Sequence, residues 1–396
     1  MESTTLSNIL DAINLQKRML LVTGCWPVRN PSFAYRCKYF LSWSIDISFQ
    51  FFLFGELYKN FTTGEYKEMT ELLSFMASEV PYLFKHLFFD WNRNRFMDAL
   101  DKLNKPMFND YPKVCDVYVQ ETIKYARIFM RFYQFTVINL VLLYFLKPFF
   151  SQQMAIRFSV FDFGSFWWFF HVYQVMCIGI ACYNNSTFDI LALGIISIGS
   201  AQFEILRDKL INATKWADLK NADIDNGSVN VELEMDEVLD KKINRYLGQC
   251  VKHHLGILEY AAEIEYTYTY YFLVQFVDSV LAICNTWFQF LLEDQLIKIM
   301  FLTFYTCTLL MQLGMYCIYG NNLMLKSEEI RDACYSSNWY QSGTKVRKSL
   351  MLIMERSKRP TVLTAGKFSV LNLATYAGLI KMSYSYFALM NRLYGD

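Results

Sequence analysis

The residue types that most often perform catalysis or hold metals are present in this chain but are not grouped. The four histidines (His86, His171, His253 and His254) do not stand at metal-ligand spacing from one another, a cysteine or an acid. The ten cysteines form no CxxC pair. Motifs for a nucleophilic serine, a phosphate-binding loop or a zinc protease do not occur. We therefore expect no enzyme, no metal site and no cofactor.

The apolar run from Phe368 to Leu393 carries polar groups that suit contact with water or with other helices. It is long enough to cross a bilayer, because about 20 residues at 1.5 Å each span a core of about 30 Å. Lys381 lies in its middle, Arg392 lies near its end, and residues 383–386 all bear hydroxyls. Such groups are unusual against lipid. We expect this run to border a polar path or neighbouring helices.

The composition of the chain is that of a membrane protein. It has 396 residues, of which 54% are hydrophobic and 19% charged. This apolar content exceeds that of ordinary soluble domains. The net charge of +1 excludes a general attraction to nucleic acid.

The apolar runs predict an all-α membrane protein with seven transmembrane helices. We place the spans at residues 39–58, 69–89, 126–146, 166–206, 262–292, 296–319 and 368–393. The fourth run is too long for one crossing, so we expect its helix to continue into water. Glu263 and Glu265 suggest the same for the start of the fifth.

The loop charges predict an inverted topology, with the N-terminus cytoplasmic and the C-terminus extracellular. Lys and Arg concentrate in the N-terminal segment and in the stretches after the second, fourth and sixth spans. This orientation puts the sequon at Asn60 outside, where we expect glycosylation, and those at Asn212 and Asn226 inside.

These features divide the chain into six segments. They are a cytoplasmic segment (1–38), the first four spans (39–210), a cytoplasmic loop with helix extensions (211–261), spans five and six (262–325), a cytoplasmic segment (326–366), and the last span with the extracellular end (367–396). The acidic stretch 221–240 predicts a disordered linker. The alternation of apolar and basic residues in 343–357 predicts an amphipathic helix.

Two classes of membrane protein fit poorly. A transporter would show internal repeats and broken helices, and seven spans do not divide into halves. A G-protein-coupled chemoreceptor would need the opposite orientation, and its usual motifs after the third span and in the seventh are missing. A receptor or channel subunit of inverted topology remains.

Several short motifs after Cys334 point to one family. They are Ser336-Ser337-Asn338-Trp339, the basic helix 345–356, Pro360, Leu363-Thr364-Ala365-Gly366 and Ser383-Tyr384-Ser385-Tyr386-Phe387. Lys85, and Asp189 with Leu206 following, give weaker support. With these motifs the chain resembles insect odorant receptors along its whole length.

The resemblance implies a non-selective cation channel that a small volatile ligand opens. Proteins of this kind assemble as heterotetramers with a common co-receptor in the plasma membrane of olfactory neuron dendrites. The chain lacks the co-receptor's long second cytoplasmic loop, so it looks like the odour-tuned partner. The runner-up is a gustatory-receptor-like channel, whose terminal signature is missing here. A seven-helix G-protein-coupled chemoreceptor ranks third.

The resemblance also implies two sites. The pore gate would lie near the outer end of the last helix, at Leu389 and Leu393 with Arg392 close by, and helical spacing puts all three on one face. The odorant pocket would lie among the outer halves of the second, third, fourth and sixth spans. Its candidate residues are Phe75, Met76, Glu79, Val80, Tyr133, Thr136, Val137, Leu140, Phe170, His171, Tyr173, Gln174, Cys177, Met300, Phe301, Phe304 and Tyr305.

Overall fold

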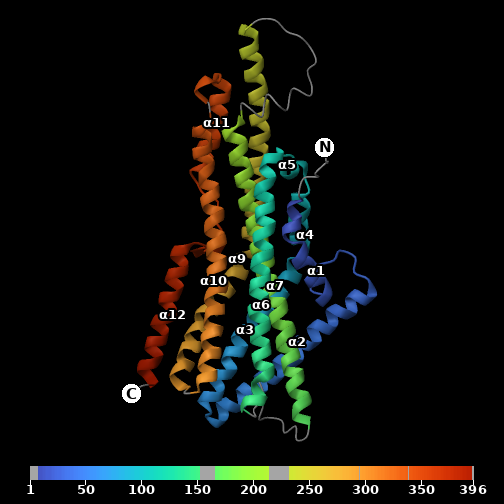
Figure 1. Cartoon of the computed structure of the whole chain (residues 1–396), viewed down its shortest axis with the longest axis vertical. Coiled ribbons are helices and arrows are strands. Elements are labelled where there is room, and N and C mark those ends of the chain that lie inside the picture. The colour runs from blue at the N-terminus through green and yellow to red at the C-terminus, as the bar shows by residue number, and fades with distance from the viewer. Residues whose placement is uncertain (1–7, 152–165, 214–231, 294, 338, 395–396) are drawn as a thin grey trace.

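The computed structural model describes residues 8–151, 166–213, 232–293, 295–337 and 339–394. Its elements are η1 (Ile9–Ala12), α1 (Asn14–Thr23), α2 (Phe33–Thr63), α3 (Tyr66–Trp91), α4 (Arg93–Leu103), α5 (Pro106–Asn109), η2 (Lys113–Cys115), α6 (Asp116–Ser151), α7 (Trp167–Ile211), α9 (Glu232–Leu292), α10 (Leu296–Ser336), η4 (Trp339–Gln341), α11 (Thr344–Ser357), β1 (Thr364–Ala365), β2 (Ser369–Val370) and α12 (Leu373–Tyr394). The long helices run along one axis (Figure 1). α11 lies at one end of that axis and α12 runs toward the other, so we call these the α11 end and the α12 end.

Each of the seven predicted spans falls on one long helix. Among the described residues, the stretches Lys113–Leu146, Trp167–Ile211, Asp240–Leu291 and Lys298–Ser336 are long and apolar enough to cross a membrane; they correspond to α6, α7, α9 and α10. α2, α3 and α12 have 31, 26 and 22 residues. Even the shortest of these is about 33 Å long at 1.5 Å per residue. All seven helices therefore have the length of a crossing, and the count of seven crossings stays a prediction.

Three helices are much longer than a bilayer is thick. α7, α9 and α10 contain 45, 61 and 41 residues, which correspond to about 68, 92 and 62 Å. Since a hydrocarbon core is about 30 Å thick, each must continue well beyond it. The predicted helical continuations of the fourth and fifth spans are confirmed.

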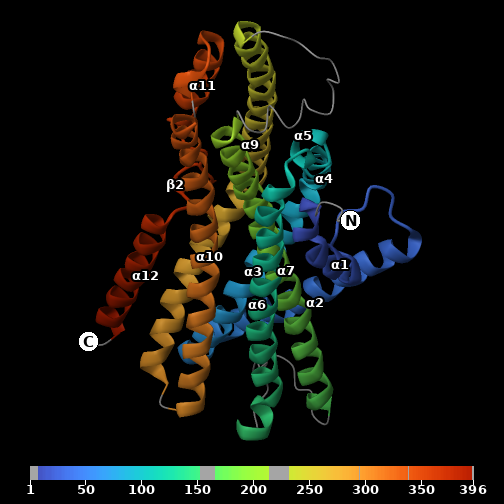
Figure 2. The same ribbon diagram turned by 45° about the horizontal axis from the view of Figure 1, so that its top comes forward.

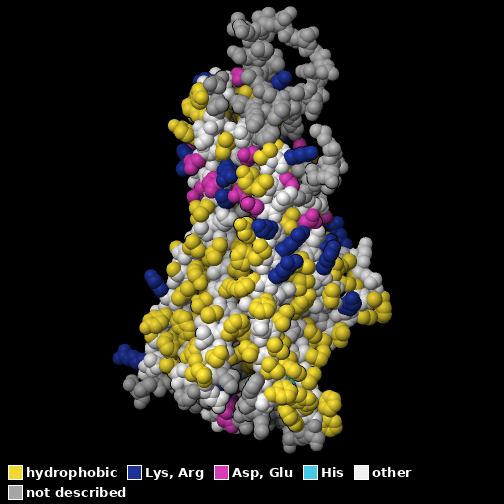
Figure 3. All heavy atoms as spheres, in the orientation of Figure 1, with side chains coloured by type: hydrophobic (Ala, Val, Ile, Leu, Met, Phe, Trp, Pro, Cys, Tyr) yellow, Lys and Arg dark blue, Asp and Glu magenta, His cyan; other side chains and the backbone are white. Residues whose placement is uncertain are grey.

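The surface separates into an apolar part and a charged part. On the face drawn in Figure 3, hydrophobic side chains cover much of the surface toward the α12 end. Lys and Arg side chains gather where this apolar region gives way toward the α11 end (Figure 3). Such a boundary is what a protein embedded in lipid on one side and extending into water on the other presents.

α7 forms the centre of the bundle. It packs against α6, α9 and α10, and from Ile190 to Ile196 every residue is buried. This explains why its apolar residues follow no single stripe, because a helix covered on all sides needs apolar residues all round. α12, by contrast, stands at the edge of the bundle beside α9 and α10 (Figure 2).

The last helix begins later than the sequence predicted. We expected it from Phe368, but α12 starts at Leu373, because Ser369–Val370 pair with Thr364–Ala365 in an antiparallel hairpin. At the turn of this hairpin Gly366 and Lys367 both have φ of 62°. The left-handed region is easily reached by glycine but strained for most other residues.

The two predicted cytoplasmic segments had different outcomes. The amphipathic helix predicted at 343–357 is confirmed as α11. Of the predicted linker 221–240, residues 221–231 lie outside the described residues, and Glu232–Asp240 form the start of α9. The prediction of a linker was therefore wrong for its second half.

All ten cysteines are free thiols.

Candidate ligand site and pore helix

Some of the predicted pocket residues meet around a tyrosine that the prediction did not include. The ring of Tyr144 in α6 lies 4.9 Å from that of Phe75 in α3 and 4.7 Å from that of Phe301 in α10. One turn further along α10, Tyr305 stacks on Phe301 and donates a hydrogen bond from its hydroxyl to the carbonyl of Ser74 at 3.3 Å. We call Phe75, Tyr144, Phe301 and Tyr305 the Tyr144 cluster. It joins α3, α6 and α10.

A second group of predicted residues meets on α2, a helix that the prediction left out. Met76 and Cys177 pack with Phe49 and Leu53 of α2 in one buried apolar group, and Phe170 and Tyr173 flank it. The ring of Phe52 lies 5.2 Å from that of Phe170. The hydroxyl of Tyr173 lies 2.5 Å from Ser48 Oγ. We call Phe49, Phe52, Leu53, Met76, Phe170, Tyr173 and Cys177 the α2 cluster. It joins α2, α3 and α7.

Other predicted residues are buried with their polar atoms already engaged. The His171 ring stacks on Trp168, and its Nε2 lies 3.3 Å from the carbonyl of Phe145. The Thr136 hydroxyl donates to the carbonyl of Tyr133 one turn earlier, at 2.7 Å. Gln174 is fully buried. These side chains fit a packing role as well as a ligand-binding one.

Three predicted residues lie apart from these two clusters. Val80 and Met300 point away from the interior and are 46% and 64% exposed. Tyr133 faces the centre of the bundle, where its hydroxyl donates to Asp189 at 3.4 Å. These positions do not favour ligand contact, and helical spacing alone could not say which face each helix turns toward its neighbours. Leu140 is buried, and Val137 and Phe304 are half-buried.

Glu79 lies beside a buried polar stripe on α2. Its side chain is 4% exposed. The stripe consists of Ser42, Asp46, Gln50, Glu56 and Asn60, all buried. Tyr82 donates to Asp46 at 2.9 Å, whereas both amide atoms of Gln50 have no partner among the described residues. Burying such groups is costly in a membrane helix. The interface between α2 and α3 is therefore unusually polar.

Asn60 is a poor acceptor for a glycan in this fold. It lies in the last turns of α2, and its side chain is 3% exposed. An N-linked glycan needs an exposed asparagine. The predicted glycosylation does not fit this position, which the sequence pattern could not reveal because the sequon was expected in a loop.

The rest of the bundle covers only one face of α12. Ser383 is fully buried toward the bundle, and Tyr376 and Leu379 pack against the core. The opposite face is exposed in the single chain, and helical spacing groups five of its residues into one stripe. The stripe is Gly378, Lys381, Ser385, Leu389 and Arg392. Two of the predicted gate residues thus share an uncovered face, and the side chain of Leu393 lies outside those that the structure describes.

Comparison with known proteins identifies the family. A family model described as "7tm Odorant receptor" matches residues 65–384. This chain belongs to the insect odorant receptors. Similar curated proteins include odorant receptor Or2 of Anopheles gambiae, 29% identical over 37% of this receptor and 39% of that protein. Odorant receptor 67c of Drosophila melanogaster is 28% identical over 40% and 39%. The matched segments span about two fifths of these relatives.

The fold of the receptor agrees with a solved relative over nearly its whole length. The olfactory receptor OR5 of Machilis hrabei, in complex with eugenol, superposes with a TM-score of 0.78. The two chains are 16% identical, and the match covers 98% of this receptor and 100% of OR5. A second structure of OR5 gives a TM-score of 0.80. At this identity the match establishes the shared fold of a multi-pass helical membrane protein.

Sequence reasoning missed the two positions around which the candidate residues gather. Tyr144 lies one turn beyond Leu140, the last α6 residue proposed, so extending the same helix face would have found it. Phe52 lies on α2, and the sequence pattern there points less clearly to a pocket residue. Apart from Gln50 the run Phe49–Leu53 is aromatic or aliphatic, and such a run gives no reason to prefer ligand contact over packing.

Proposed function

We propose that this receptor is an odour-tuned subunit of a ligand-gated, non-selective cation channel. It binds a small volatile molecule among the helices at the α12 end and opens a pore together with a co-receptor. The observation that carries this proposal is the uncovered polar stripe on α12, in a chain that belongs to the odorant receptors. A helix with Lys381 and Arg392 on its free face is not built to meet lipid alone.

The orientation that we propose puts the α11 end in the cytoplasm. The band of Lys and Arg at the edge of the apolar surface supports this, since basic residues favour the cytoplasmic side (Figure 3). The C-terminus then lies outside the cell. We propose that the receptor resides in the plasma membrane of olfactory neuron dendrites.

The Tyr144 cluster is the best candidate for ligand contact. It combines apolar ring faces with the hydroxyls of Tyr144 and Tyr305, the mixture that a small, weakly polar ligand requires. Burial of apolar ligand surface contributes roughly 25 cal/mol per Å². The rings already touch, so a ligand enters by displacing contacts between α3, α6 and α10. A relative of the same fold was solved with eugenol, which supports a small-molecule site.

Gating follows if the ligand binds the open state more tightly than the closed state. Separation of α3, α6 and α10 at the α12 end would move α12, which packs on α9 and α10. The gap between copies of Leu389 and Leu393 would then widen and rehydrate.

Charge on α12 supports a mixed assembly. Four copies would place four Lys381 and four Arg392 side chains around one path, and such rings oppose cations. A channel in which only some subunits are this receptor carries fewer of these charges. We therefore propose assembly with co-receptor subunits as a heterotetramer.

The test is current recording in cells that express the receptor with and without the co-receptor, over a panel of volatiles. We expect odour-evoked cation current only with both. Tyr144→Leu should shift the potency of active odorants about two- to tenfold, because each lost aromatic pair is worth about 0.5–1.5 kcal/mol. Phe135→Leu is the matched control, since Phe135 lies on the same helix and is 64% exposed.

Two results would contradict the proposal. One is odour-evoked current that arises through a second messenger and leaves the receptor itself without conductance. The other is equal potency shifts in the Tyr144 and Phe135 variants, which would remove the Tyr144 cluster from the ligand site.

A further inference from the structure

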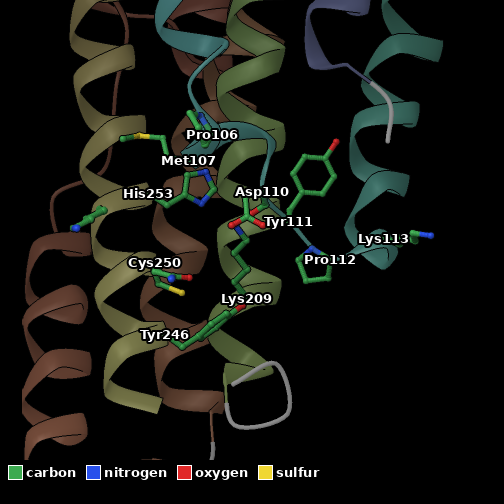
Figure 4. A pocket seen from close by; sticks show the side chains of 12 residues that line it. Pro106, Met107, Asp110, Tyr111, Pro112, Lys113, Lys209, Tyr246, Cys250 and His253 are labelled. Carbon is green, nitrogen blue, oxygen red and sulfur yellow. The ribbon is translucent and has the colours of Figure 1, made fainter. Parts of the chain in front are cut away.

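A cavity lies far from the proposed odorant site, toward the α11 end. It has a volume of about 440 Å³ and is formed by α5, the loop after it, the last turns of α7, and α9 (Figure 4). This volume is within the usual range for small-molecule sites. Its position on α9 puts it outside the membrane, because His253 is 39 residues, or about 58 Å, from Leu292 at the end of that helix.

One residue that lines the cavity has a buried ring nitrogen that lacks a partner among the described residues. His253 is 2% exposed, and its Nε2 lies 2.7 Å from Gln202 Oε1. The amide nitrogen of Gln202 donates to the carbonyl of Phe108 at 3.2 Å, which leaves Oε1 to accept from His253. The proton of the neutral ring is therefore on Nε2, and Nδ1 is an acceptor without a partner among the described residues.

The charge state of His253 agrees with this assignment. Burial, reinforced by the nearby charges of Lys209 and His254, holds the pKa of His253 well below its usual range. The ring is then neutral at physiological pH, so Nδ1 keeps its lone pair and can accept a hydrogen bond but not donate one.

Two further groups extend the polar wall. Tyr246 is 7% exposed, and its hydroxyl also has no partner among the described residues. Lys209 is 8% exposed and reaches from α7 toward the loop, where its Nζ donates to the carbonyl of Asp110 at 2.8 Å. Lys113 and Lys252 also line the cavity but are exposed, and Lys113 points away from it (Figure 4), so Lys209 is the lining lysine that is buried beside Asp110.

We propose that this cavity binds a phosphate ester that carries hydroxyl groups beside the phosphate. The phosphate oxygens accept from Lys209 and from the Tyr246 hydroxyl, and a ligand hydroxyl donates to His253 Nδ1. A simple anion without a donor would leave Nδ1 unsatisfied, and an apolar odorant would satisfy neither group. Tyr111 and Met107 line the cavity beside these groups and offer apolar surface to the carbon ring of such a ligand.

This chemistry has two sources in a cell, a soluble sugar or inositol phosphate and the headgroup of a phosphoinositide lipid. The inference is independent of the proposed odorant site, because it concerns the opposite end of the bundle. Occupancy would clamp α5, α7 and α9 together and so act on the helices that also enter the membrane.

The test uses the purified full-length receptor in phosphatidylcholine nanodiscs. Binding of inositol 1,4,5-trisphosphate is followed by thermal unfolding and calorimetry, with sulfate as the anion that lacks a hydroxyl donor. A second arm uses nanodiscs that contain phosphatidylinositol 4,5-bisphosphate and no soluble ligand. We expect stabilisation by the ester in at least one arm and at least tenfold weaker binding of sulfate. The arm that responds identifies the source.

Conservative variants test the assigned atoms. Tyr246→Phe removes only the hydroxyl, and His253→Gln keeps a donor toward Gln202 while removing the Nδ1 acceptor. Each should weaken binding about tenfold, the effect of one lost hydrogen bond. Tyr268→Phe is the matched control, since its hydroxyl is also buried without a partner but is remote from the cavity.

Loss of ligand binding can be told apart from loss of folding. Tyr246→Phe should fold at least as well as the parent, because it removes an unpaired buried group, and its unfolding temperature without ligand checks this. Absence of binding in both arms, equal binding of sulfate, or unchanged affinity in both cavity variants would overturn the proposal.

Discussion

At the scale of single residues, one buried ion pair organises the centre of the bundle. Lys85 Nζ of α3 lies 2.5 Å from Asp189 Oδ1 of α7, and both side chains are at most 1% exposed. The carboxylate also accepts from the hydroxyls of Tyr271 and Tyr316, at 2.9 and 2.5 Å, and from the Gln312 amide. A buried pair contributes little net stability unless other hydrogen bonds complete it, and here donors from α9 and α10 do so.

Loss of one partner of this pair should be worse than loss of both charges. Lys85→Met leaves a buried carboxylate without its cation, which costs about 3–5 kcal/mol. Adding Asp189→Asn removes that charge and should restore part of the stability. Unfolding of the purified receptor and its surface expression measure the effect. A double variant less stable than Lys85→Met would contradict this account of the pair.

The sequence could name Lys85 and Asp189 but not their contact. The resemblance singled out both residues, whereas 104 positions separate them along the chain. The same holds for Phe75 and Phe301, both of which contact Tyr144. Pairings of this kind depend on how long helices are rotated about their axes, and the periodicity of a helix that is apolar all round does not determine that rotation.

At the scale of elements, the hairpin before α12 sets where that helix starts. The Gly366 amide donates to the carbonyl of Thr269 at 2.8 Å, and the Thr364 amide donates to Glu265 Oε2 at 2.7 Å. The hairpin is thus held on α9 by its own backbone. The sequence marked Glu265 as costly in hydrocarbon, and the hydrogen bond from Thr364 offsets part of the cost of burying its carboxylate.

Gly366→Ala should destabilise the receptor. A methyl group at this position would approach Leu273 Cδ2 to 2.7 Å, and φ of 62° is strained for alanine. The left-handed conformation alone costs about 1–2 kcal/mol. We expect lower surface expression and a lower unfolding temperature.

Gly248→Ala is the matched control for the hairpin. It lies inside α9, and a methyl group there would meet no atom within 4 Å. Alanine is the better helix former by about 1 kcal/mol. Equal losses in the two variants would contradict the role assigned to the turn at Gly366.

The free face of α12 predicts an effect of charge on permeation. Replacing Lys381 or Arg392 by glutamine removes positive charge from the stripe, so the permeability to Ca²⁺ relative to Na⁺ should rise. Reversal potentials of the odour-evoked current measure this. Lys124→Gln, an exposed position on α6, is the control. Unchanged reversal potentials in both α12 variants would place these charges away from the ion path.

At the scale of the whole molecule, the sequence predicted the architecture better than the sites. Long apolar runs and basic loops have strong physical signatures, and all seven predicted spans fall on long helices. The hairpin at 364–370 was not predicted, because two short strands between a proline and an apolar run leave little periodic pattern in the sequence. The exposure of Val80 and Met300 could not be foreseen, because a membrane helix shows apolar residues both to lipid and to its neighbours.

The most direct measurement is the accessibility of single cysteines on α12. Ser385→Cys lies on the free stripe, and Ser383→Cys, two residues earlier, lies on the buried face. With the co-receptor present, a positively charged thiol reagent applied outside the cell should reduce odour-evoked current in the Ser385 variant, faster during odour stimulation, and leave the Ser383 variant unchanged. Modification of Ser385→Cys only from the cytoplasmic side, or modification without any change in current, would contradict a pore bordered by an outward-ending α12.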